Sequence, residues 1–328
     1  HYHGLGTAII YRFIVKIRLL APLLAFLKLP SFTCEKTFKV KHMQWFKQKN
    51  NNAWTAIRCT DNDIGIATVI RHQNRKPLVS VANIEPGNLE NKQTLKTLRD
   101  KYKVNKTRCT FVLGFSRYQL VQIEKPNVPT DEIKQAIRWK LKDMIDYPVE
   151  QATIDVIDIP PDPANAKRQQ YVFAVVANNQ QLAEVSNQLV NAGVNLQVID
   201  AHIFAQRNIA SLLEEKNRGL AMLSFNSSGG LLTFTSGGEL YHARRIEVDG
   251  ERNKTAFETI ILELQRSLDH FDSQFPYITI NKLMLAPFEL RDAFCEHLRN
   301  YINLPVVTFE LNDIFDFDAH IDLGDLSR

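Results

Sequence analysis

Residues 54–82 read WTAIRCTDNDIGIATVIRHQNRKPLVSVA. The polar triplets Asp61-Asn62-Asp63 and Gln73-Asn74-Arg75 are typical of turns, and they divide this stretch into three short apolar runs. Apolar runs bounded in this way predict β-strands, at 54–60, 64–71 and 77–82. A helical pattern near 95–98 and a fourth strand at 109–113 follow. The region therefore predicts three meandering strands, a helix and a further strand.

The same order of elements returns in residues 220–247, which read LAMLSFNSSGGLLTFTSGGELYHARRIE. Three apolar runs are again separated by glycine-containing turns. A helix is predicted at 255–275, because apolar residues recur every three or four positions and Thr255 with Glu258 forms a capping box. A strand, a helix and a strand complete the block, at 282–286, 288–301 and 305–309. Two such blocks indicate an α/β protein of the actin-like kind, with duplicated ribonuclease-H-like lobes.

A third segment separates the two blocks. Thr130 is predicted to cap a helix that ends at Tyr147-Pro148. Its buried face is predicted to hold Ile133, Ile137, Leu141, Met144 and Ile145. Strands at 152–159, 171–177 and 196–199 and a helix at 180–192 belong to the same insert, and Gly193 suits a left-handed helix cap. The predicted regions are a leader at 1–42, the first lobe at 43–128, an α/β subdomain inserted in that lobe at 129–200, and a linking helix with the second lobe at 201–328.

The charge is distributed unevenly along the chain. Of its 40 Lys/Arg and 36 Asp/Glu, seven basic residues and one acidic residue lie in 1–42, which leaves 33 basic and 35 acidic residues beyond it. This balance gives no reason to expect a nucleic-acid partner. The leader has three open interpretations: sequence upstream of a true start at Met43, a basic amphipathic membrane-surface segment, or a signal peptide. Its uncharged runs are too short for a spanning helix.

Neither the cysteines nor the histidines have the spacing of a metal site. The four cysteines include no Cys-x-x-Cys pair, and the nine histidines include no His-x-x-x-His pair. Free cysteines in apolar runs usually act as small buried hydrophobes. The sequence therefore predicts neither a metal nor a disulfide framework.

Three segments resemble the PilM-like family of type IV pilus assembly proteins, which is related to actin and FtsA. They are residues 129–157 (PTDEIKQAIRWKLKDMIDYPVEQATIDVI), residues 171–205, and residues 262–275 (LELQRSLDHFDSQF). The short second lobe and the start Met43-Gln44-Trp45-Phe46 point to the MshI branch, which serves MSHA pili. The resemblance is specific in the order of its segments rather than in one signature.

The resemblance implies an ATP site made by two hairpin tips and a glycine-rich loop, and this sequence departs from all three. Thr60 stands in place of a glycine at the first tip, Asn226 in place of one at the second, and Pro287-Phe288-Glu289 in place of the loop. We therefore expect no cofactor and no enzymatic activity. The alternative is an active ATPase, with Asp61 or Asp63 at the metal. Any bound nucleotide would contact Asp61, Asp63, Asn226, Ser227, Ser228 and Gly229.

By resemblance, the protein is expected to be a cytoplasmic scaffold at the inner membrane. It would hold the N-terminal tail of a single-pass, PilN- or MshJ-like membrane protein and contact the pilus motor complex, and homo-oligomerisation is left open. Trp139 is predicted to project away from the apolar face of its helix, between two cations, which is typical of a partner anchor. Packing of Trp139 under the insert's own strands is the alternative. The predicted partner-binding residues are Arg138, Trp139, Asp146, Tyr147 and Pro148.

Overall fold

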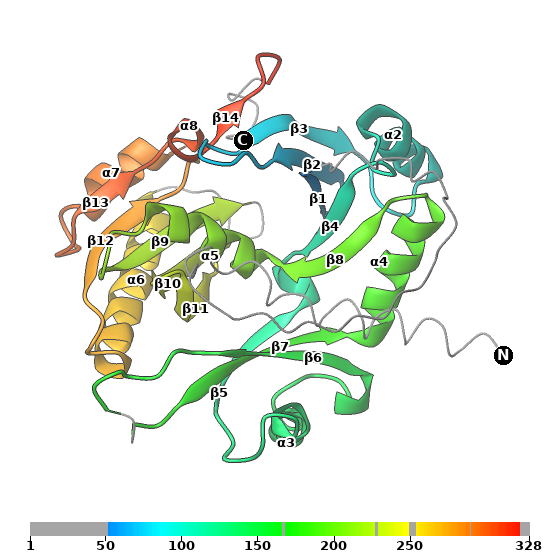
Figure 1. Ribbon diagram of the computed structural model, residues 1–328. Coiled ribbons are helices and arrows are strands. Elements are labelled where there is room, and N and C mark those ends of the chain that lie inside the picture. Colours follow the sequence, from blue (N-terminus) through cyan, green and yellow to red (C-terminus); the bar gives the residue numbers. More distant parts are fainter. Residues whose placement is uncertain (1–51, 166–167, 227–228, 249–253, 289, 322–328) are drawn as a thin grey trace, which may run out of the picture.

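The computed structural model describes residues 52–165, 168–226, 229–248, 254–288 and 290–321 (Figure 1). The leader, Ser227, Ser228 and the side chain of Thr255 lie outside this part of the chain. The helix predicted at 255 begins at Lys254, so Thr255 is inside its first turn. None of the described helices combines the length and apolar character that crossing a membrane requires.

The first lobe is built on a six-stranded sheet. Its strands lie in the order β14-β3-β2-β1-β4-β8. The bounds are β1 Ala53–Cys59, β2 Asp63–Ile70, β3 Leu78–Pro86, β4 Arg108–Leu113, β8 Leu196–Ala201 and β14 Asp316–Phe317, and helix α2 spans Lys92–Tyr102. β1 to β3 form the predicted antiparallel meander, and β4 runs parallel to β1.

The second lobe repeats this plan. Its five-stranded sheet has the order β11-β10-β9-β12-β13. The bounds are β9 Gly219–Asn226, β10 Gly229–Ser236, β11 Glu239–Ile246, β12 Ile280–Leu285 and β13 Val306–Thr308, with helices α6 Lys254–Gln274, α7 Arg291–Leu298 and α8 Leu311–Ile314. The first lobe's β3-β2-β1-β4-β8 and this sheet follow the same order of meander and parallel strands. The predicted duplication is confirmed.

The insert forms a separate three-stranded sheet below the two lobes in Figure 1. It contains β5 Gln119–Glu124, β6 Ala152–Asp158 and β7 Tyr171–Asn178, with helices α3 Ile133–Leu141 and α4 Asn179–Asn191. β5 was not predicted, and it begins ahead of residue 129. β8 was assigned to the insert, and this was wrong, because it pairs with β4 in the first lobe. The domain boundaries themselves stay a prediction.

Local chemistry explains how several helices begin and end. Asn178 caps α4, since its side chain accepts hydrogen bonds from the backbone N–H groups of Gln180 and Gln181. The predicted left-handed cap at Gly193 is confirmed by its φ of 83°. The predicted Thr130 cap is wrong: α3 begins after Glu132, without a side-chain cap. α3 ends at Leu141, so Met144 does not lie on the buried face of the helix as predicted. Its side chain is 50% exposed.

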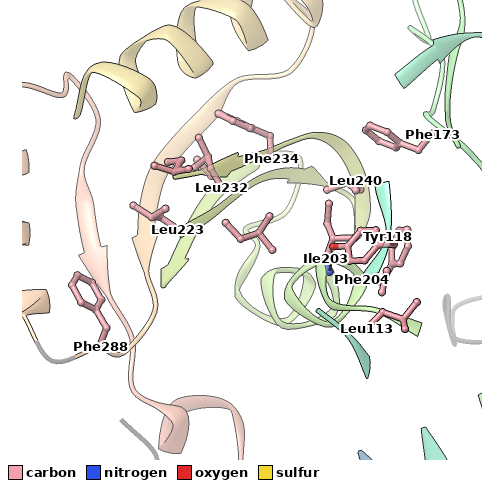
Figure 2. Packing of buried hydrophobic residues seen from close by; sticks show 14 of the residues in the cluster. Leu113, Tyr118, Phe173, Ile203, Phe204, Leu223, Leu232, Phe234, Leu240 and Phe288 are labelled. Atoms are coloured by element: carbon pink, nitrogen blue, oxygen red, sulfur yellow. Dashed lines mark hydrogen bonds between the residues drawn. The ribbon is translucent and has the colours of Figure 1, made fainter. Parts of the chain in front are cut away.

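A continuous apolar core joins the two lobes and the insert. Figure 2 shows Phe173 of the insert, Leu113 of the first lobe, and Leu223, Leu232 and Phe234 of the second lobe around one interior. Helix α5, His202–Leu213, crosses between them and contributes Ile203 and Phe204. Burial of large apolar side chains supplies most of the driving force for folding. The lobes and the insert therefore fold around a shared interior.

Gln206 is the polar exception in this interior. It lies on α5 and is only 4% exposed. Its amide Nε2 donates to the carbonyl oxygens of Met222 and Leu231 at 2.9 and 3.0 Å, and to Thr233 Oγ1 at 3.0 Å. Its Oε1 accepts from the Ser224 hydroxyl. One side chain thus fixes the linking helix to β9 and β10.

Two further contacts lie at the periphery, one between the insert and the second lobe and one between the two lobes. In the chain after β6, Arg168 donates to the Gln274 carbonyl at 2.9 Å and lies over the Tyr277 ring, both in the second lobe. At the other end, β14 follows the second lobe in sequence but pairs with β3 of the first. The second lobe is therefore held to the insert and to the first lobe at the periphery, as well as through α5.

Replacing Gln206 with Met should lower the free energy of unfolding by about 1–3 kcal/mol, because the buried carbonyl and hydroxyl groups lose their donor while the volume is nearly kept. Urea unfolding measures the difference. Gln181→Met, at an exposed position of α4, serves as the control and should change little. Equal stability of the two variants would contradict a structural role for the Gln206 amide.

Candidate functional site

A cavity lies between the turns that connect the first two strands of each lobe. Its volume is about 110 Å³. The first lobe contributes residues 58–61 at the end of β1 and residues 112–117 from the end of β4 onward. The second lobe contributes Asn226, and α5 contributes His202. Asp61 and Asn226, two of the predicted nucleotide contacts, therefore reach one cavity although they are far apart in sequence.

The first turn uses its own polar groups. Thr60 N–H donates to the Asp63 carbonyl at 2.9 Å, and Asp63 N–H donates to Thr60 Oγ1 at 3.1 Å. The Asp63 carboxylate lies 3.6 Å from the Arg58 guanidinium, and Asp63 is not among the residues that line the cavity. Donors that would cradle a phosphate must point outward from such a turn. Here the Thr60 and Asp63 N–H groups close the turn instead.

The second turn is shaped by close backbone packing. Gly229 has a φ of 121°, and a Cβ atom there would lie 2.8 Å from the Ile246 carbonyl oxygen. Only glycine fits this position without strain. The glycine predicted as a nucleotide contact thus has a structural reason in the close packing of β10 against β11.

Aromatic side chains fill the space beside the second turn. Phe288, in the segment that replaces the glycine-rich loop, is 8% exposed and packs against Phe225 with ring centroids 5.0 Å apart. Phe294 of α7 lies against both rings. Pockets for drug-sized ligands usually measure about 300–1,000 Å³. The cavity of 110 Å³ is well below that range.

His202 is the residue at the cavity whose pKa is shifted most clearly from its ordinary value. Its ring lies edge-on to Phe115 at 5.1 Å, and its Nδ1 has no hydrogen-bond partner in the described part of the chain. Burial, and then the Arg58 guanidinium, lowers the pKa of His202 to about 4. The Asp200 carboxylate accepts from the Ala201 N–H at 2.8 Å, one residue before α5 begins. Sequence reasoning did not find the Phe115–His202 contact, because no local pattern marks it.

The predicted partner-binding residues lie at α3 and the turn after it, away from this cavity. Trp139 is 68% exposed, so the alternative in which it packs under the insert's strands is wrong. Arg138 donates to the carbonyl oxygens of Val149 and Ala152, which holds α3 against the start of β6. Tyr147 is half-buried, Pro148 is exposed, and Asp146 accepts from the Gln119 amide at 3.4 Å. Trp139 and Pro148 are thus the exposed members of the set with apolar surface.

No family model and no curated protein matches the sequence. Solved structures do match. The PilM-PilN type IV pilus biogenesis complex contains a chain with 17% identity and a TM-score of 0.65, and the match covers 83% of this chain and 93% of that chain. A Bacteroides thetaiotaomicron protein with an actin-like ATPase fold and unknown function has 10% identity and a TM-score of 0.51, with 84% and 96% covered. At these identities the likeness concerns the fold, and the predicted actin-like fold is confirmed.

The pKa of His202 predicts a pH dependence of stability. The folded protein favours the neutral imidazole, so the contribution is present above the ordinary pKa of 6.5 and is lost as the pH falls from 6.5 towards 4. His202→Gln should reduce the loss of unfolding free energy between pH 7 and pH 4 by about 1–3 kcal/mol. Unfolding in urea at a series of pH values measures it. The exposed His72→Gln is the control, and identical pH profiles for the two variants would contradict the buried environment of His202.

Proposed function

We propose that this protein is a non-enzymatic scaffold of type IV pilus assembly, of the MshI kind that serves MSHA pili. The observation that carries the proposal is the fold likeness over 93% of a chain in the PilM-PilN complex, together with the sequence resemblance in three segments. The scaffold is placed in the cytoplasm at the inner membrane. Its partner is the cytoplasmic tail of a PilN- or MshJ-like single-pass protein, and it contacts the pilus motor complex.

The proposed docking surface for the tail is the outer side of α3. A short tail loses conformational entropy when it binds, so its affinity depends on a few well-packed anchors. Trp139 offers the largest exposed apolar side chain on this helix. Ile137 and Leu141 are buried on the opposite face and bind α3 to the three-stranded sheet, which keeps the Trp139 side rigid. A rigid aromatic side chain is the kind of residue that forms a binding hot spot.

The proposed absence of ATPase activity rests on the cavity between the lobes. The small volume, the first turn closed by its own hydrogen bonds, and the packed Phe225, Phe288 and Phe294 rings all work against a bound nucleotide. Phosphoryl transfer also needs carboxylates that hold Mg²⁺. Of the two candidate metal ligands, Asp61 and Asp63, Asp63 already forms an ion pair with Arg58. We therefore propose that no cofactor is needed.

The second candidate function is an active actin-like ATPase of the same machinery. One observation favours it: Asp61 and Asn226, from the two lobes, line the same cavity. A modest separation of the lobes would enlarge this space. The two functions differ in whether ATP binds the folded protein at all.

Millimolar Mg²⁺-ATP should leave the melting temperature unchanged if the protein is a scaffold. Ligand at a hundred times its dissociation constant would stabilise the folded state by about 2.7 kcal/mol, which corresponds to several degrees. Differential scanning fluorimetry with and without Mg²⁺-ATP measures the shift. A rise that Asp61→Asn abolishes would favour the ATPase.

Changing Trp139 to Ala should weaken binding of the membrane protein's cytoplasmic tail about thirtyfold, which corresponds to the loss of one hot-spot anchor. The melting temperature should change little, because the side chain is exposed. Titration of a labelled tail peptide by fluorescence anisotropy measures the affinity.

The control is Tyr301→Ala, which removes an aromatic residue that is 51% exposed in the second lobe. Normal binding by the folded Trp139→Ala protein would show that α3 is not the interface. Absence of any binding by the unmodified protein would count against the scaffold function itself.

A further inference from the structure

Helix α2 carries a stripe of positive charge. Lys92, Lys96 and Arg99 lie on it, and Lys103 follows directly at its C-terminal cap. Spacings of four and three residues place Lys92, Lys96 and Arg99 on one face of the helix. Lys103 adds a cation at the C-terminal end, where the backbone is left-handed with a φ of 53°. All four are exposed. Lys106 and Arg108, also exposed, continue the run toward β4, and between residues 91 and 108 the only acidic residue is Asp100.

The structure leaves most of this charge without a counter-charge. Arg99 pairs with the adjacent Asp100 at 3.0 Å. In the described part of the chain, no carboxylate pairs with Lys92, Lys96 or Lys103. Like charges four residues apart on a helix destabilise it by a few tenths of a kcal/mol. The stripe therefore slightly destabilises α2 in the free protein, and a bound anion would reduce the repulsion between its like charges.

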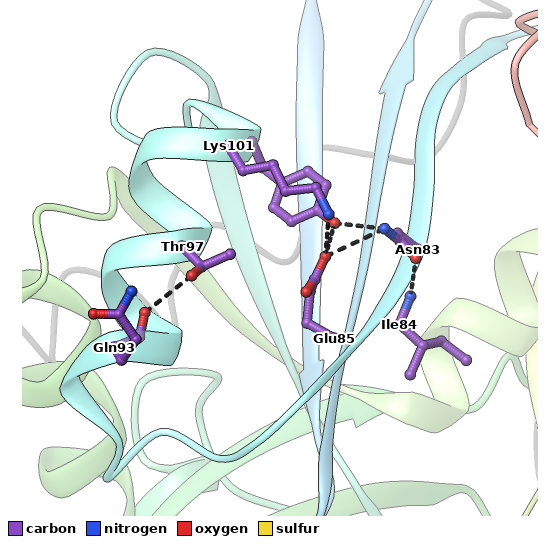
Figure 3. Close-up of polar contacts among 7 residues, drawn as sticks. Asn83, Ile84, Glu85, Gln93, Thr97 and Lys101 are labelled. Atoms are coloured by element: carbon purple, nitrogen blue, oxygen red, sulfur yellow. Dashed lines mark hydrogen bonds and ion pairs between the residues drawn. The ribbon is translucent and has the colours of Figure 1, made fainter.

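Lys101 is the exception, and it shows how α2 is held. Figure 3 shows Lys101 turned toward β3, where its Nζ lies 2.6 Å from the Glu85 carboxylate. The Tyr102 hydroxyl donates to the same carboxylate, and Asn83 donates to it at 3.3 Å. On the inner face, Leu95 and Leu98 are buried in the core. These contacts fix α2 so that the stripe stays on the outside.

The first described strand lies beside β4, where the run of cations ends. β1 begins at Ala53, and Trp54 pairs in register with Arg108, whose guanidinium lies over the Trp54 ring. Residues 1–42 combine seven Lys/Arg and one Glu with short apolar runs. Basic residues together with apolar residues are the composition of segments that bind anionic membrane surfaces.

We propose that the stripe on α2, defined by Lys92, Lys96, Arg99 and Lys103, docks the protein on an anionic phospholipid membrane. Clustered cations bind such a surface additively without requiring a shaped pocket, which suits a straight row of mostly lysine side chains. The acidic balance of the chain beyond the leader disfavours extended contact with a nucleic acid. The membrane contact is separate from the tail-binding surface, because α2 and α3 lie at opposite ends of the molecule in Figure 1.

The experiment measures partition of the full chain onto vesicles by sedimentation. Binding is expected to vesicles of phosphatidylcholine mixed with phosphatidylglycerol, to weaken as salt is raised, and to be absent with phosphatidylcholine alone. The triple variant Lys92→Gln, Lys96→Gln, Arg99→Gln should lower the partition coefficient roughly a hundredfold, at about fivefold for each cation. Glutamine keeps the helix propensity, so the melting temperature should be retained.

The control removes three exposed cations elsewhere, through Arg75→Gln, Lys216→Gln and Arg218→Gln, and should bind as the unmodified protein does. Lys92→Arg with Lys96→Arg keeps the charge and should also bind normally. Equal binding by the stripe and control variants, or binding that ignores phosphatidylglycerol, would overturn the proposal. So would stripe-dependent binding to duplex DNA without binding to vesicles. If the stripe variant loses vesicle binding but still binds the tail peptide, the result would support the membrane contact independently of the proposed tail-binding surface.

Discussion

Helix α5 is the element on which the rest of the structure depends. It links the two lobes in sequence and lies between them in space, with Ile203 and Phe204 in the shared core. Gln206 adds directional hydrogen bonds to β9 and β10 from within this apolar surrounding. A buried amide left without these partners would cost more than the bonds themselves contribute. The polar contacts therefore select one orientation of the helix, and the apolar contacts stabilise it.

This packing also determines the space between the lobes. His202 begins α5, and its ring against Phe115 forms one wall of the cavity. At the periphery, Arg168 of the insert contacts Gln274 and Tyr277 of the second lobe, and β14 pairs with β3 of the first lobe. Moving the lobes apart to widen the cavity would break the contacts made by α5, by Arg168 and by β14. Such a body is better suited to present fixed surfaces than to close around a ligand, which agrees with the scaffold proposal.

The exposed surfaces divide along the same lines. The three-stranded sheet has one face in the shared core, through Phe173, and the other covered by α3. That arrangement leaves the outer side of α3 free, with Trp139 on it. In the first lobe, α2 is fixed to β3 by the contacts around Glu85, which leaves its basic face outward. The proposed tail-binding and membrane-binding surfaces thus lie on α3 and α2, and the opposite face of each helix is buried against the rest of the protein.

The sequence alone determined the duplicated order of strands and helices and, in outline, the cap at Gly193. These features follow from apolar periodicity and turn chemistry, which act over a few residues. It did not reveal β5, or that β8 belongs with β4, because strand pairing across a long insertion leaves no local pattern. Nor did it show that Arg138 holds the start of β6, or that the Thr60 turn satisfies its own donors. Only the tertiary structure decided these points, since hydrogen bonds and charge neutralisation depend on which distant groups meet. The basic stripe of α2 was missed for a related reason. A charge count over the whole chain does not show that several cations lie on one face of one helix.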